Sequence, residues 1–85
     1  MSKTLYVGNL SQQVTKEDLA QMFAQAGGVE SISLPLDHLG RHKGVGYITL
    51  ADADSAEAAI FEWNHTEVAG QIIRVSYAFN QPENL

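Results

Sequence analysis

The chain has 85 residues, with ten acidic and five basic side chains that give a formal net charge of −5. This length suffices for one compact domain with a modest core, and a hydrophobic content of 45 % argues against disorder. The absence of cysteine excludes disulfide frameworks and thiolate zinc sites, and it fits a reducing, cytoplasmic compartment. No apolar run approaches the roughly 20 residues of a membrane helix, so we expect no membrane segment and no signal peptide.

The first half of the chain predicts a strand, a helix and a second strand. Residues 4–9 alternate between apolar and other side chains, which is typical of a strand. Residues 15–18 (Thr-Lys-Glu-Asp) resemble a capping box, and the apolar residues that follow at helical spacing predict a helix that stops at residues 27–28 (Gly-Gly). Residues 29–36 predict a strand at the sheet edge, because Pro35 cannot donate to a ladder.

The second half predicts a strand, a helix and a final strand. Residues 43–50 alternate, and one face of this strand carries Lys43, Val45, Tyr47 and Thr49. Asp52 or Asp54 is expected to cap the second helix. Residues 72–78 predict the last strand, and residues 81–85 read as a short polar tail.

This βαββαβ order predicts an α+β fold of the ferredoxin-like type. Right-handed crossovers give a four-stranded antiparallel sheet with both helices on one face. We expect one domain over residues 1–80, in which the first and third strands are the central pair. The second face of the sheet stays open to solvent. Tyr6 and Tyr47 fall on that face, where exposed rings are candidates for stacking on unpaired bases.

Two segments resemble the signature motifs of the RNA recognition motif family. Residues 43–50 (Lys-Gly-Val-Gly-Tyr-Ile-Thr-Leu) are similar to its ribonucleoprotein octapeptide, and residues 5–10 (Leu-Tyr-Val-Gly-Asn-Leu) resemble its hexapeptide. The resemblance covers residues 3–78 and extends to the stand-alone, single-motif proteins of bacteria. It implies binding of single-stranded RNA on the open sheet face, with stacking by Tyr6 and Tyr47 and a phosphate contact by Lys43.

One position departs from the family pattern. Val45 occupies an aromatic position of the octapeptide, so one stacking platform is missing. Since base stacking is worth ~1–3 kcal/mol per base, we expect weak binding.

Basic and acidic side chains are expected on opposite faces of the domain, although the net charge is negative. Four of the five basic residues map to the open face or the loop beside it, whereas most acids map to the helices. Phosphate contacts are expected from Lys43, Arg41, Arg74 and Lys3. Contacts to base edges are expected from Ser76 and from backbone groups near Ala78.

Other functions compete with RNA binding. The fold could serve mainly for protein contact, through the helical face near Phe61 or through the sheet itself, and the two tyrosines could simply be cross-strand partners. Phe79 could cover the sheet or cap the core. The acylphosphatase family shares the βαββαβ order, but residues 8–14 lack the arginine of that family's phosphate loop, so we expect no enzyme. We also expect no cofactor, no metal site at the histidines His38, His42 and His65, and a monomer.

Overall fold

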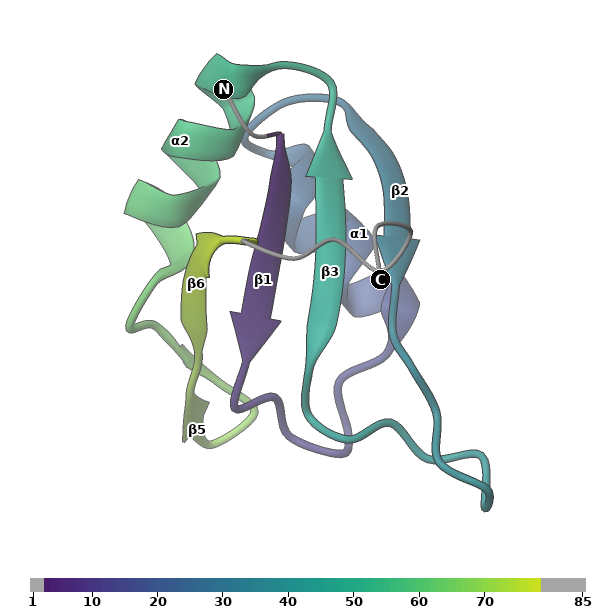
Figure 1. The fold of residues 1–85 in the computed structure, drawn as a ribbon. Helices are drawn as coiled ribbons and strands as arrows, with labels where there is room; N and C mark the ends of the chain where they lie inside the picture. Colours follow the sequence, from purple (N-terminus) through teal and green to yellow (C-terminus); the bar gives the residue numbers. More distant parts are fainter. Residues whose placement is uncertain (1–2, 79–85) are drawn as a thin grey trace.

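The computed structural model describes residues 3–78, so Phe79 and the predicted tail at 81–85 lie outside the described residues. The elements follow the predicted order, with one small addition (Figure 1). They are β1 (Thr4–Gly8), α1 (Lys16–Ala24), β2 (Val29–Ser33), β3 (Gly46–Leu50), α2 (Ala53–Trp63), β4 (Glu67–Val68), β5 (Gln71–Ile72) and β6 (Arg74–Tyr77). Neither helix in the described range is long and apolar enough to cross a membrane.

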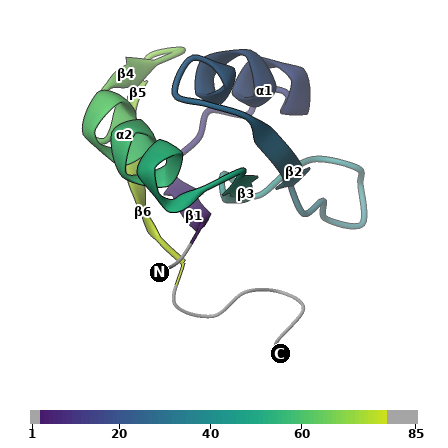
Figure 2. The same cartoon turned by 90° about the horizontal axis from the view of Figure 1, so that it is seen from above.

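The main sheet has the strand order β2-β3-β1-β6, and every pairing in it is antiparallel. Figure 2 shows both helices on one side of this sheet, and no described helix on the other side. The predicted ferredoxin-like α+β sandwich, with β1 and β3 at its centre, is therefore confirmed.

The core lies between the sheet and the helices, where the inward residues of the two central strands meet the helical layer. Leu5 and Val7 of β1 and Ile48 and Leu50 of β3 are all fully buried. Phe23 of α1 packs against Trp63 of α2 with ring centroids 6.2 Å apart, which closes the helical layer. Alternation then directs the intervening residues of β1 and β3 to the open side.

Side-chain caps set the start of both helices. Thr15 Oγ1 accepts from the Asp18 amide at 3.1 Å, and Asp18 Oδ2 accepts from the Thr15 amide at 3.0 Å, which confirms the capping box. Of the two candidate caps for α2, Asp52 is the one used: its Oδ1 accepts from the Ser55 amide at 2.7 Å. This hydrogen bond holds the pKa of Asp52 below its ordinary value.

The two strands that flank the long loop are each three residues shorter than predicted. The second strand ends at Ser33 rather than at residue 36. The third strand begins at Gly46 rather than at Lys43, because Gly44 has a φ of +82°, which an extended strand does not allow. Lys43 and Val45 therefore belong to the connecting loop.

The hairpin of β4 and β5 was not predicted. It turns at Ala69 and Gly70, both with positive φ (52° and 86°), which suits a two-residue hairpin turn. Ile72 belongs to this hairpin, so the last strand of the main sheet starts at Arg74 rather than at residue 72.

Candidate nucleic-acid interface

Two tyrosines lie side by side at the centre of the open sheet face. Tyr6 of β1 is directly opposite Tyr47 of β3 in the register, and both are half-buried. Their ring centroids are 6.0 Å apart with an interplanar angle of 66°, an edge-to-face arrangement. The pair thus places two adjacent aromatic surfaces on the open face, where the sequence predicted them, and such surfaces can stack on unpaired bases.

Gly8 determines how the Tyr6 ring lies. A Cβ built on Gly8 would be 2.5 Å from Tyr6 Oη and 2.8 Å from the ring carbon Cε2. The ring therefore extends along the sheet over Gly8, the next residue on the same face of β1. Any larger residue at this position would push the ring aside.

A row of hydroxyl groups crosses the sheet through the two tyrosines. Ser33 of β2 pairs with Tyr47, and Ser76 of β6 pairs with Tyr6, so the order across the face is Ser33, Tyr47, Tyr6, Ser76. Both serines are exposed. The sequence prediction included Ser76 but missed Ser33. Ser33 lies two residues before Pro35, and strand alternation could have predicted that its side chain points outward.

A second row of hydroxyls lies one step along the strands. Ser31 pairs with Thr49, and Thr49 pairs with Thr4. The Thr4 and Thr49 hydroxyls are 3.0 Å apart and hydrogen-bonded. Hydroxyls both donate and accept, so these rows can meet base edges or ribose hydroxyls without adding charge.

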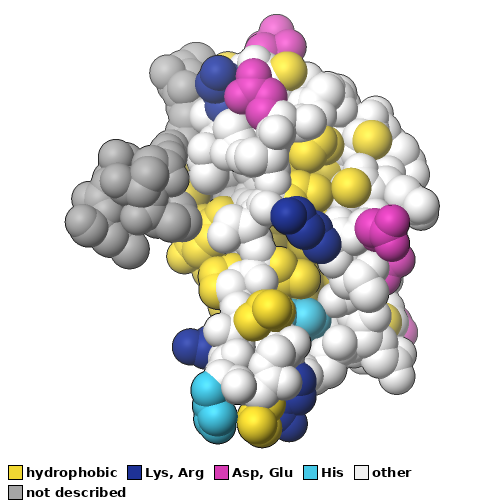
Figure 3. Space-filling model, turned by 90° about the vertical axis from the view of Figure 1, so that its right-hand side faces the viewer, with side chains coloured by type: hydrophobic (Ala, Val, Ile, Leu, Met, Phe, Trp, Pro, Cys, Tyr) yellow, Lys and Arg dark blue, Asp and Glu magenta, His cyan; other side chains and the backbone are white. Residues whose placement is uncertain are grey.

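The positive charge of this face is weaker than the sequence suggested. Lys3 lies 4.0 Å from Glu30, and Arg41 Nε lies 3.4 Å from the Asp37 carboxylate. Seen from the β2 edge in Figure 3, basic and acidic side chains adjoin at the upper end of the molecule. Most acids were expected on the helices, but Glu30 of β2 and Asp37 of the following loop pair with two of the four basic residues assigned to the open face.

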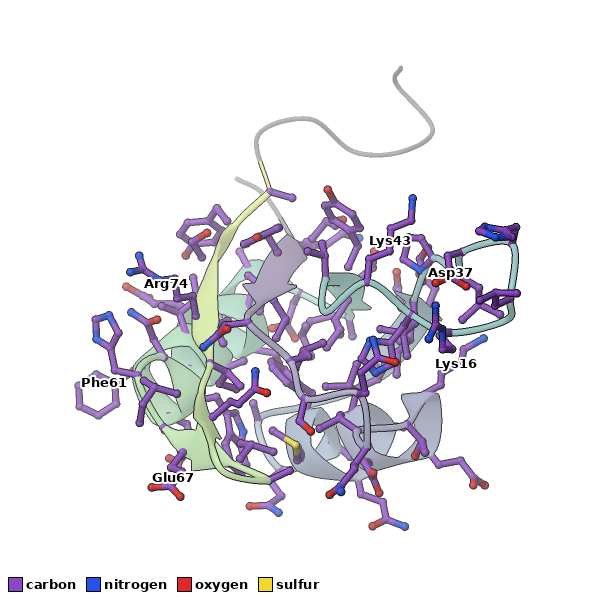
Figure 4. All side chains as sticks on the ribbon, turned by 90° about the horizontal axis from the view of Figure 1, so that it is seen from below. Lys16, Asp37, Lys43, Phe61, Glu67 and Arg74 are labelled. Atoms are coloured by element: carbon purple, nitrogen blue, oxygen red, sulfur yellow. The ribbon has the colours of Figure 1, made fainter. Side chains whose placement is uncertain are left out.

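Lys43 and Arg74 keep their charge without an ion pair to any described residue. Arg74 pairs with Gly8 in the register of β1 and β6, and Lys43 precedes the entrance to β3. Figure 4 shows the two side chains on opposite sides of the central strands. They flank the tyrosine pair and are the better-placed of the four predicted phosphate contacts.

The loop that carries Lys43 is organised by its own side chains. Asp37 Oδ1 accepts from the amides of Leu39 (2.8 Å) and Arg41 (3.0 Å), and the Arg41 amide above all holds the pKa of Asp37 below its ordinary value. His42 is buried, and its Nδ1 accepts from the Gly44 amide at 3.0 Å. His42 therefore stabilises the loop, and among the described residues no cluster of ligands suits a metal.

The two remaining predicted residues lie at the borders of the face. Val45 is half-buried in the loop, two residues before Tyr47. The amide of Ala78 donates to the Thr4 carbonyl at 3.0 Å. That amide is therefore engaged in the sheet, and the predicted contact near Ala78 would have to use another group.

A hydrogen-bonded clamp joins the end of β1 to the small hairpin, and sequence reasoning missed it. Asn9, with a φ of +60°, donates from Nδ2 to the Ile72 carbonyl at 2.7 Å. Gln71 Nε2 donates back to the Asn9 carbonyl at 2.9 Å. Asn is one of the few residues that tolerate a positive φ, so an Asn directly after the first strand could have indicated a turn at this position.

Comparisons with known proteins agree on one family. Residues 5–74 match the family described as the RNA recognition motif. The putative RNA-binding protein RbpE of Nostoc is 36 % identical over 76 residues, which cover 88 % of this chain and 77 % of that protein. Protein gar2 of Schizosaccharomyces pombe is 42 % identical over 78 residues, 91 % of this chain but only 15 % of gar2. The crystal structure of the RNA-binding protein PG1 superposes with a TM-score of 0.89 at 35 % identity, covering 95 % of this chain and 99 % of that one.

Proposed function

Because the chain belongs to the RNA recognition motif family, we propose that it binds short single-stranded RNA on the open sheet face. The observation that carries this proposal is the Tyr6–Tyr47 pair, two rings 6.0 Å apart on a face that no described helix covers. Successive unpaired bases would stack on these rings. Ser33 and Ser76 at the two ends of the same row would hydrogen-bond base edges or ribose.

We assign the main phosphate contacts to Lys43 and Arg74. Lys3 and Arg41 would first have to leave Glu30 and Asp37, although such exposed pairs are weak and exchange readily. With about two phosphates neutralised, the logarithm of affinity should fall against the logarithm of salt concentration with a slope of about −1.4.

Binding is proposed to be weak, on the order of micromolar or poorer. Val45 gives an aliphatic surface where the family's octapeptide has an aromatic ring, and a missing stacked base forfeits ~1–3 kcal/mol. The net charge of −5 also gives little long-range attraction for a polyanion.

We infer a binding protein rather than an enzyme, acting as a monomeric single domain over residues 1–80 in a bacterial cytoplasm. The family match supports a binding protein, and the similarity to RbpE of Nostoc supports a bacterial setting. Size-exclusion chromatography with light scattering would test the monomer, since a dimer would double the mass.

An NMR titration of the full chain with a pool of short single-stranded RNAs tests the proposed function. We expect amide and ring shifts at Tyr6, Tyr47, Ser33 and Ser76, with smaller shifts at Lys43. Shifts confined to α1 and α2, or none at millimolar RNA, would contradict the proposal.

A second candidate function rests on Phe61. This ring on α2 is 91 % exposed and projects outward from the helix at the margin of the molecule (Figure 4). We propose that it marks a protein contact on the helical face. Crosslinking through a photoreactive phenylalanine at position 61 in cell extract, followed by mass spectrometry, tests this. A single recurrent protein is expected, and a random background of abundant proteins would contradict it.

A further inference from the structure

A groove of about 660 Å³ lies between the start of α1, β2 and the loop that follows β2. Its floor is aliphatic and is formed by Val14, Ile32, Leu34 and Leu36. Figure 3 faces this edge of the molecule and shows hydrophobic side chains gathered in its middle. Leu36 remains 59 % exposed there. Neither Tyr6 nor Tyr47 lines the groove, and it meets the proposed RNA site only at Ser33 and Arg41 on its border.

The groove follows the outer edge of the main sheet. Ile32 and Ser33, the last two residues of β2, border it, and residues 34–36 continue the border beyond the end of the strand. The side chains of residues 32 and 33 point to opposite faces of the sheet, so a groove that meets both lies along the strand edge. β2 is the end strand of its sheet, and no described strand pairs with its outer side. Such an edge can accept an extended peptide through main-chain hydrogen bonds.

The charge around the groove is opposite in sign to that of the whole chain. Lys16 and Arg41 border it, and no acidic residue does, although the chain carries a net charge of −5. Arg41 is partly compensated by Asp37, but Lys16 makes no ion pair with another described residue. A basic rim over an aliphatic floor complements a segment in which acidic and aliphatic residues alternate.

From this arrangement we propose that the groove docks an extended acidic-aliphatic segment of a partner protein. Aliphatic side chains of the segment lie on Leu34 and Leu36, and a carboxylate meets Lys16. RNA is a poorer fit, because unpaired bases are held by exposed aromatic rings, whereas no Phe, Tyr or Trp lines this groove and its one imidazole, His42, is buried. The proposal is independent of RNA binding on the sheet face.

The test is an NMR titration of the full chain with two peptide pools. The first pool consists of amidated octapeptides in which Asp or Glu alternates with Leu, Ile or Val. The second has Lys or Arg in place of the acids. We expect the acidic pool to shift the amides of Lys16, Ile32 and Leu36 and to leave Tyr6 and Tyr47 unchanged. The basic pool should produce no shift at these positions.

Paired variants then test the contacts. Leu36→Asn should weaken binding of the acidic pool about tenfold or more, whereas Leu39→Asn should not, because Leu39 is equally exposed (63 %) but lies outside the groove. Lys16→Gln should weaken binding about threefold or more. Gln21→Glu changes the net charge by the same amount on the same helix outside the groove and should have no effect.

Several results would overturn the proposal. These are no shifts at millimolar acidic pool, equal losses in Leu36→Asn and Leu39→Asn, or groove shifts with short RNA instead of peptide. Groove shifts that depend on protein concentration without peptide would instead identify a second copy of the chain as the occupant. Loss of RNA binding in Tyr47→Ala with peptide binding intact would leave this proposal standing.

Discussion

Tyr6 and Tyr47 face each other across the central strand pair, with ring centroids 6.0 Å apart and an interplanar angle of 66°. Each ring is half-buried by its neighbours on the sheet and not by the helical core. The arrangement holds two aromatic surfaces rigidly next to each other, so that little conformational freedom remains to be lost when bases stack on them.

Replacing Tyr47 by alanine should abolish most RNA binding while the domain stays folded. One stacked base is worth ~1–3 kcal/mol, so the affinity should fall roughly 5- to 150-fold. Fluorescence anisotropy with a labelled short RNA measures the loss, and circular dichroism checks the fold. Phe61→Ala is the control, because it removes an exposed ring from the opposite layer; an equal loss in that variant would count against stacking.

Replacing Val45 by phenylalanine should strengthen RNA binding. The residue lies two positions before Tyr47, at the entrance to β3, and an aromatic ring there would add a third platform. We expect a gain of about fivefold or more in the same anisotropy assay. Val68→Phe adds the same ring in the small hairpin and should leave the affinity unchanged. An unchanged affinity for Val45→Phe would show that this position does not meet a base.

Replacing Gly8 by alanine should impair RNA binding more than stability. The added Cβ would meet the far end of the Tyr6 ring, which can swing away without disturbing the core. Gly46→Ala is the matched control, since its Cβ would instead meet Leu34 at 3.2 Å and Leu19 at 3.6 Å on the helical side. Thermal unfolding and RNA affinity should therefore separate the two variants, with Gly46→Ala lowering Tm and Gly8→Ala lowering affinity. A lower Tm for Gly8→Ala together with a lower RNA affinity for Gly46→Ala would contradict the orientation of the Tyr6 ring.

The salt dependence of RNA binding should be shallow. Two phosphate contacts predict a slope of about −1.4, and Lys43→Gln should reduce it to about −0.7. Lys16→Gln removes a charge outside the sheet face and should leave the slope unchanged. A wild-type slope steeper than about −4 would contradict an interface with so few charges.

The cap of α2 should make stability depend on pH in the acid range. The pKa of Asp52 is lowered in the folded state by the hydrogen bond from the Ser55 amide. Its contribution is therefore fully present above the ordinary value of 3.8 and is lost as the pH falls through the lower folded pKa. Asp52→Asn keeps a capping side chain without the charge. Urea unfolding should show a difference from wild type near pH 6 that shrinks towards pH 2, and a constant difference would contradict this account.

Strand alternation and element order sufficed to predict the sheet topology and the outward positions of Tyr6 and Tyr47. They could not show that the strand after the loop starts at Gly46, because this depends on the backbone of Gly44. The small hairpin was missed because Ala69–Gly70 is not the Asn-Gly or Asp-Gly pair that usually marks such a turn.

The ion pairs were beyond sequence reasoning for a physical reason. The ion pairs of Lys3 with Glu30 and of Arg41 with Asp37 depend on strand register and loop conformation, and neither follows from periodicity alone. Alternation could place Ser33 on the outward face, but its position opposite Tyr47 also depends on the register. Sequence patterns therefore predicted the aromatic centre of the candidate site, whereas the pairings of its polar surroundings required the structure.

The most direct test of the central claim is an isotope-filtered NMR experiment on the complex with a short single-stranded RNA. The account predicts intermolecular nuclear Overhauser effects between base protons and the ring protons of both Tyr6 and Tyr47. Effects that involve only residues of α1 or α2, or only ribose protons at the edge of the sheet, would contradict it.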